Sequence, residues 1–198
     1  HEPETIQTIL DNRGDGVVVH AGAYIGDFLP ALSGMGHTVY AFEPSSEFFM
    51  CCQKTLELNF PNGEHDTTLI NKGLSSEISS GNKLLVMEDE FLSEGGCARI
   101  MPNADGVEEF RLEDVELTTI DSELDRHDNV SVIHLDIEGF EEAALKGAMK
   151  TLRASRPMLI LEITLNVASH LEDNEFYREV LFKDLGYNII QKLHGWNF

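Results

Sequence analysis

The chain has 198 residues, of which 42% are hydrophobic and 25% charged, a composition typical of globular proteins. This length fits a single domain over residues 1–198 and excludes disorder, collagen and a disulfide scaffold as descriptions of the whole chain. Its 35 acidic and 14 basic residues leave a net charge of −21. Because nucleic acids and anionic membrane surfaces bind through Lys and Arg, we expect neither as a partner.

Cysteine content and hydropathy bear on which class of protein this is. The three cysteines, Cys51, Cys52 and Cys97, are too few and too poorly spaced for a zinc site, and their odd number argues against a disulfide framework. No apolar run reaches the ~18–20 residues of a membrane span, and the acidic, polar start of the chain is unlike a secretory signal. We therefore expect a cytoplasmic protein with reduced thiols.

Strands and helices are predicted to alternate through the first part of the chain. Short β-branched or aromatic runs predict strands at 17–20, 38–42 and 67–70, separated by helices at 27–33 and 47–59. This order favours an α/β fold with mostly parallel strands and helices on both faces of the sheet.

Residues 75–121 break this rhythm, because they contain two strand-like runs, at 83–87 and 115–120, and a polar stretch around Gly95–Cys97 without helical periodicity. We expect a β-rich insertion near 75–121. The alternation then resumes, with strands expected at 130–136, 157–163 and 187–191 and helices at 140–152 and 174–185, the last ended by Gly186.

The first candidate site is the turn after the first strand, which contains Gly22 and Gly26. Ligands of such folds lie at the carboxyl ends of strands, where glycine lets them approach the backbone. The dinucleotide fingerprint G-x-G-x-x-G would need glycine where the chain has Ala21 and Ala23, which disfavours NAD. A simple packing turn between strand and helix is the alternative interpretation.

Glu43 ends the second predicted strand, about twenty residues after the glycine turn. An acceptor-only carboxylate at a strand end can bind both ribose hydroxyls of an adenosine ligand. In so acidic a chain, a solvated strand-end acid is the alternative. Together with the glycine turn, Glu43 favours adenosine binding.

A third candidate is the run His134-Leu135-Asp136-Ile137-Glu138. Alternation along a strand predicts that His134, Asp136 and Glu138 point the same way, and ionisable groups on an apolar strand are costly unless they line a cleft. They could orient a substrate and take a hydroxyl proton, or bind a divalent metal, or serve only as a helix cap and a satisfied histidine. We expect no metal requirement.

Weaker candidates for site residues are Glu162, which lies near the end of a later apolar strand, and Asn71–Leu74 after the third strand.

Four segments of the chain form an ordered set of motifs: V-H-A-G-A-Y-I-G-D at 19–27, A-F-E-P at 41–44, N-K-G-L-S at 71–75, and L-D-I-E-G-F-E at 135–141 leading to L-K-G-A at 145–148. Through these segments the chain resembles the FkbM-type family of S-adenosylmethionine-dependent methyltransferases. The last segment, an acidic D-x-E-G before an L-K-G-A helix, is the most specific of the four.

The resemblance implies a Rossmann-like class I methyltransferase, a three-layer sandwich with a seven-stranded sheet. It implies an enzyme that O-methylates a hydroxyl on a small molecule, such as a sugar or a polyketide-like compound, with S-adenosylhomocysteine as product. Asp136 would act as base or contact the substrate, helped by His134 and Glu138. The implied cofactor-binding residues are His20, Gly22, Ala23, Tyr24, Gly26, Glu43, Pro44, Gly73, Leu74 and Asp136.

Three positions depart from the family pattern. The family usually has Asp at the position of His20, often Asn at Tyr24, and often Lys at His134. A non-catalytic adenosine-binding or interaction module with the same fold is therefore the alternative function.

Overall fold

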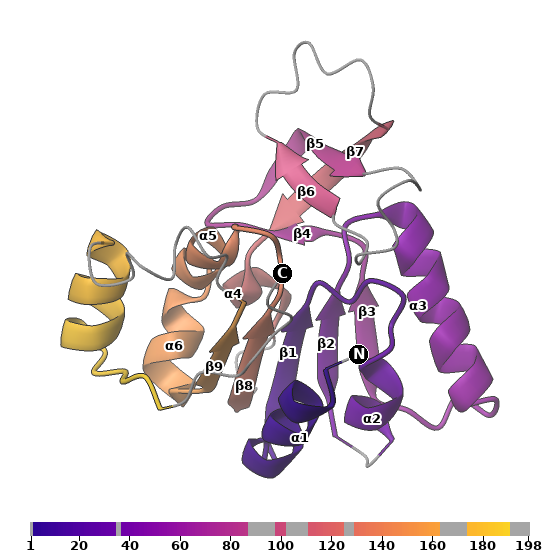
Figure 1. Ribbon diagram of the computed structural model, residues 1–198, viewed down its shortest axis with the longest axis horizontal. Helices are drawn as coiled ribbons and strands as arrows, with labels where there is room; N and C mark the ends of the chain where they lie inside the picture. The colour runs from indigo at the N-terminus through magenta and orange to yellow at the C-terminus, as the bar shows by residue number, and fades with distance from the viewer. Residues whose placement is uncertain are drawn as a thin grey trace.

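A five-stranded parallel sheet forms the centre of the molecule, with strand order β3-β2-β1-β8-β9 (Figure 1). The computed structural model describes residues 2–34, 37–86, 98–101, 111–124, 129–162 and 174–190. The five strands are β1 (Val17–Ala21), β2 (Val39–Phe42), β3 (Thr67–Ile70), β8 (Val130–Leu135) and β9 (Met158–Leu161). Because every pair in this sheet is parallel, all five carboxyl ends meet at one edge.

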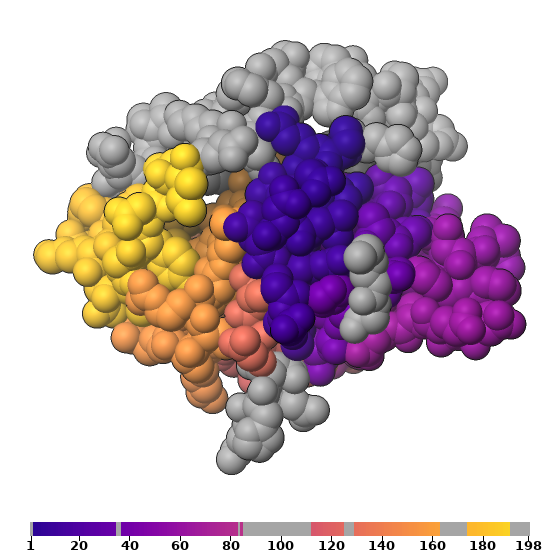
Figure 2. All heavy atoms as spheres, turned by 90° about the horizontal axis from the view of Figure 1, so that it is seen from below, coloured from indigo at the N-terminus to yellow at the C-terminus, as the bar shows by residue number. Residues whose placement is uncertain are grey.

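Helices cover both faces of this sheet, as the sequence predicts. One face carries α1 (Pro3–Asn12), α2 (Leu29–Ser33) and α3 (Ser46–Asn59), and the other carries α4 (Ile120–Glu123), α5 (Glu141–Lys146), α6 (Met149–Ser155) and the π-helix η2 (Phe176–Asp184). Val18 packs into the first layer and Val19 into the second, since neighbouring strand residues face opposite sides. Seen from below, α1 lies between α3 and the C-terminal helices (Figure 2).

A second sheet stands over the carboxyl edge of the first (Figure 1). It has the order β4-β7-β5-β6 and consists of β4 (Gly73–Leu74), β5 (Ser79–Val86), β6 (Ala98–Met101) and β7 (Arg111–Thr118). This inserted sheet has a small core of Leu84, Val115 and Leu117, against which Phe140 packs. The β-rich insertion is confirmed, while Gly95–Cys97 lies outside the described residues.

The single helix expected over 140–152 is wrong, because the chain forms α5 and α6 with a break at Gly147–Ala148. Gly147 is pressed against the inserted sheet, and a Cβ there would lie 2.1 Å from the carbonyl oxygen of Ser75. The Asp121 carboxylate then accepts the N–H groups of Lys150 and Thr151 at 2.8 and 2.9 Å, which caps the start of α6. The glycine of the L-K-G-A segment is therefore a packing requirement.

The C-terminal part also differs from expectation. Gly186, at φ +66°, ends the predicted helix, but residues 187–190 form no strand. The Tyr187 N–H instead bonds to the Leu181 carbonyl at 2.9 Å, and the Tyr187 ring lies 5.3 Å from the Arg156 guanidinium carbon. These contacts fold the segment back on the helix rather than along β9.

Several boundaries are set by local capping. The strand expected over 115–120 ends at Thr118, because Thr119 and Ser122 form a capping box that starts α4. The helix expected from residue 27 starts at Leu29, just before Pro30. Helix α1 was not predicted, although Pro3 in its first turn and the spacing of Ile6, Ile9 and Leu10 are typical of a helix.

None of the described helices has the length and apolar character needed to cross a bilayer.

Candidate functional site

The turn after β1 is held against two other parts of the carboxyl edge. Gly22 has φ +84°, and a Cβ there would lie 1.8 Å from the Asp136 carbonyl oxygen at the end of β8. Gly26 has φ +79° and lies against Cys52 of α3, where a Cβ would be 3.0 Å from the Cys52 Cα. Tyr24, between them, also has a left-handed φ of +48°. Close packing therefore requires both glycines, whether or not a ligand approaches them.

Glu43 lies at the end of β2 with only 4% of its surface exposed. Its Oε2 accepts the N–H of Tyr24 at 2.8 Å and its Oε1 accepts the N–H of Ser45 at 2.9 Å. Burial raises the pKa of Glu43 to about 7, against the opposing effect of these two N–H groups and with a smaller contribution from the charge of Glu113. Each carboxylate oxygen keeps acceptor capacity for a further donor.

The N-K-G-L segment links Glu43 to the inserted sheet. The Asn71 side chain donates to the carbonyls of Glu43 and Pro44 at 2.8 and 3.0 Å, which fixes the end of β2. Gly73 and Leu74 are buried in β4 and pair with β7. Three predicted cofactor-binding residues are therefore placed. Pro44 lies beside Glu43, and Gly73 and Leu74 form the strand that connects the central sheet to the inserted sheet.

Three carboxylates meet where β8 and β9 end. Oxygen atoms of Asp136, Glu138 and Glu162 lie within 4.8 Å of one another. Burial raises the pKa of Asp136 most, followed by its hydrogen bond with Glu162 and by the charges of Glu162 and Glu138. Within this carboxylate cluster, Asp136 therefore holds a proton more tightly than an ordinary carboxyl group does. Glu162 belongs to this cluster because β9 lies beside β8 in the sheet. Alternation along a single strand does not predict a contact between two strands.

The turn between β8 and α5 presents Glu138. Glu138 and Gly139 both have left-handed φ values, +53° and +98°. The buried Glu141 carboxylate accepts the N–H groups of Ile137 and Gly139, both at 3.2 Å, and so stabilises this turn. No role was predicted for Glu141, although it ends the L-D-I-E-G-F-E segment and is an acid in the first turn of a helix.

The strand alternation expected through Glu138 does not extend beyond Leu135, and His134 does not belong to the carboxylate cluster of Asp136, Glu138 and Glu162. The strand ends at Leu135, and the following turn carries Glu138 out of strand geometry. The His134 ring instead stacks on His20 of β1 and on Phe28, with centroids 5.0 and 5.4 Å apart.

His20 and His134 form a buried pair of neutral imidazoles. Their Nδ1 atoms are 2.8 Å apart, so one ring donates and the other accepts. Burial lowers the pKa of both, to about 4 for His134. The Nε2 of His20 is buried without a hydrogen-bond partner among the described residues. A buried polar atom left in this way is suited to a polar ligand atom or water.

The fold and this site define an α/β domain with its functional groups at the carboxyl edge of a parallel sheet. Residues 20–189 match the family model described as the methyltransferase FkbM domain. The chain therefore belongs to the FkbM methyltransferase family, which confirms the resemblance in the sequence.

Two solved structures are similar to this chain. The crystal structure of methyltransferase FkbM from Methylobacillus flagellatus KT matches 74% of this chain and 32% of its own length, with 23% identity and a TM-score of 0.52. At that identity the match shows the fold alone. An uncharacterized protein from Burkholderia thailandensis matches 55% of this chain and 32% of its own length at 17% identity, and its TM-score of 0.27 is too low to support an argument. This chain thus spans about a third of the length of either protein. A search of curated proteins found no match.

Proposed function

We propose that this domain transfers a methyl group from S-adenosylmethionine to a hydroxyl of a small molecule, such as a sugar or a polyketide-like compound, and releases S-adenosylhomocysteine. Membership of the methyltransferase family supports the reaction class. The acceptor class follows from the resemblance, and a net charge of −21 favours an acceptor without phosphate groups.

Glu43 is the observation that carries the cofactor proposal. Two backbone N–H groups hold its oxygens at the carboxyl end of β2, and burial keeps water from competing for them. Such a carboxylate fits a ribose diol, whose two hydroxyls both donate. The unpartnered Nε2 of His20, at the end of neighbouring β1, offers a second buried polar contact for the same ligand.

Asp136 is the proposed base. When bound, S-adenosylmethionine supplies an activated sulfonium methyl group. Asp136, at the carboxyl edge, would accept the proton of the acceptor hydroxyl, and its raised pKa makes its ionised form a stronger base than an ordinary carboxylate. Glu138, held in place by Glu141, would help to orient the acceptor, and such orientation can contribute roughly 7–11 kcal/mol toward lowering the barrier.

Calorimetric titration with S-adenosylhomocysteine, with NAD as the comparison, tests this proposal. We expect micromolar binding of the first and none of the second, followed by methyl transfer from S-adenosylmethionine in a screen of hydroxylated sugars and polyketides. Binding without transfer to any acceptor would support the non-catalytic alternative. Absence of S-adenosylhomocysteine binding would contradict the cofactor proposal.

Binding of S-adenosylhomocysteine should weaken as the pH falls below 7. Ribose hydroxyls donate to the ionised carboxylate, so the ligand binds the deprotonated form of Glu43, whose pKa in the folded protein is raised to about 7. Affinity should therefore be highest near pH 8.5 and fall by up to about tenfold per pH unit below that pKa. The charge of Glu113 acts on Glu43, whereas Cys52, whose pKa is raised to about 12, stays a neutral thiol over this range. Calorimetry from pH 5.5 to 8.5 checks this, and a constant affinity would show that Glu43 does not titrate in the site.

The variant Glu162→Gln should move the acid limb of the methyl-transfer rate to lower pH. Asp136 acts as a base only above its pKa, which Glu162 raises through a hydrogen bond and its charge. Removing that charge should shift the limb down by about one pH unit. Rates measured between pH 5 and 10 give the shift, with Glu175→Gln on the exposed surface as the matched control. An unchanged profile would show that the titrating base is not coupled to Glu162, against the role proposed for Asp136.

A further inference from the structure

Glu113 of the inserted sheet contacts the first residues of α3. Its Oε1 accepts the N–H of Ser46 at 2.8 Å, and its Oε2 accepts the Ser45 hydroxyl at 3.4 Å. Ser45 precedes the helix but makes no side-chain cap of its own. A carboxylate from β7 therefore takes the place of the usual N-cap, where free N–H groups and the helix dipole favour negative charge.

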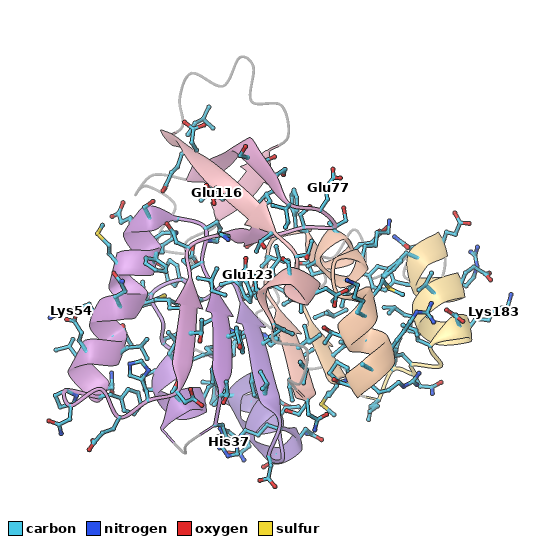
Figure 3. All side chains as sticks on the ribbon, turned by 180° about the vertical axis from the view of Figure 1, so that it is seen from behind. His37, Lys54, Glu77, Glu116, Glu123 and Lys183 are labelled. Atoms are coloured by element: carbon cyan, nitrogen blue, oxygen red, sulfur yellow. The ribbon has the colours of Figure 1, made fainter. Side chains whose placement is uncertain are left out.

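The geometry of β7 explains why an acid reaches this position. Glu113, Val115 and Leu117 alternate along the strand and share one side of it, and Val115 and Leu117 form the core of the inserted sheet with Leu84. Glu113 pairs directly with Leu84 in the β5–β7 ladder. Glu116 faces the opposite way with an exposed side chain and is labelled on the inserted sheet in Figure 3. Glu113 is thus the acid on the packed side of this strand.

This contact lies next to Glu43. The N–H of Ser45 bonds to Glu43 and the next N–H along the chain, that of Ser46, bonds to Glu113. Asn71 holds the carbonyls of Glu43 and Pro44 on the other side. The segment from Glu43 to Ser46 is therefore fixed by the central sheet and by the inserted sheet together.

We propose that Glu113 is a positioning residue of the adenosine site, through which the docked inserted sheet holds the Glu43–Ser46 segment in the geometry that binds the ligand. This inference rests on the proposed function and deepens it. It makes the affinity for S-adenosylhomocysteine depend on a residue that belongs to the insertion and that contacts Glu43 through the Ser45–Ser46 backbone, in addition to the effect of its charge on Glu43.

Calorimetric titration of folded variants with S-adenosylhomocysteine tests the proposal. Glu113→Ala should weaken binding by about tenfold, the size of effect expected for loss of a helix cap. Glu113→Gln keeps an oxygen that can accept the Ser46 N–H and should restore affinity to within about threefold of wild type. Glu116→Ala, on the exposed side of the same strand, is the matched control and should change affinity by less than about twofold.

A second variant removes the donor and leaves Glu113 in place. Ser46 is the first residue of α3 and Ser45 has ψ 125°, so Ser46→Pro is compatible with the helix and removes the N–H together with the exposed Ser46 hydroxyl. It should weaken binding several-fold without lowering the urea midpoint. Affinities of Glu113→Ala and Ser46→Pro that both equal wild type would overturn the positioning role. A wild-type protein that does not bind S-adenosylhomocysteine would overturn the proposed function, and this inference with it.

Discussion

Glu43→Ala should weaken binding of S-adenosylhomocysteine by at least about 100-fold, because each hydrogen bond to a charged group contributes about 1.5–3 kcal/mol and a ribose diol makes two. The effect should be large because the carboxylate is already oriented by the Tyr24 and Ser45 N–H groups and shielded from water. Calorimetry at pH 8, where Glu43 is largely ionised, measures the loss.

A matched control separates the site from the general acidity of the chain. Glu57 lies on α3 with its side chain 67% exposed and forms an ion pair with Lys54, which points away from the sheet in Figure 3. Glu57→Ala should bind the ligand within about twofold of wild type, since exposed ion pairs contribute little. Circular dichroism would verify that both variants are folded. Equal affinity of Glu43→Ala and wild type would remove Glu43 from the site.

Gly22→Ala should destabilise the domain by more than about 3 kcal/mol, because it combines an unfavourable backbone conformation with a clash. The new Cβ would lie 1.8 Å from the Asp136 carbonyl oxygen, a backbone atom that cannot rotate away. Relief of the clash would have to separate the end of β1 from the end of β8. Urea denaturation measures the change in the free energy of unfolding.

Gly63→Ala is the control that measures the cost of the left-handed backbone conformation without a clash. Gly63 has a similar φ of +72° but nothing lies within 4 Å of its Cβ position. It should cost only about 1–2 kcal/mol. If both substitutions cost the same, the approach of Gly22 to Asp136 is not a rigid feature of the fold.

Much of the fold was predictable because it depends on local patterns. Short β-branched or aromatic runs predict the parallel strands, and the near-continuous apolar runs of β1 and β8 reflect strands covered on both faces. Gly22 and Glu43 follow two consecutive predicted strands, which places both at the carboxyl edge of the sheet. The structure has them there. The loss of periodicity after residue 75 predicted the inserted sheet, although not its pairing.

Contacts between distant segments were not predictable in the same way. Glu162 joins Asp136 because β9 lies beside β8, and His20 meets His134 because β1 lies on the other side of β8. The break at Gly147 depends on Ser75, and the cap of α3 depends on Glu113, 67 residues further along the chain. Most of the element types, the family and the residues at the strand ends were predictable from the sequence alone, because these follow from local periodicity and short motifs. Only the tertiary structure decided which of those residues touch, because such contacts depend on strand order and close packing between segments far apart in the chain.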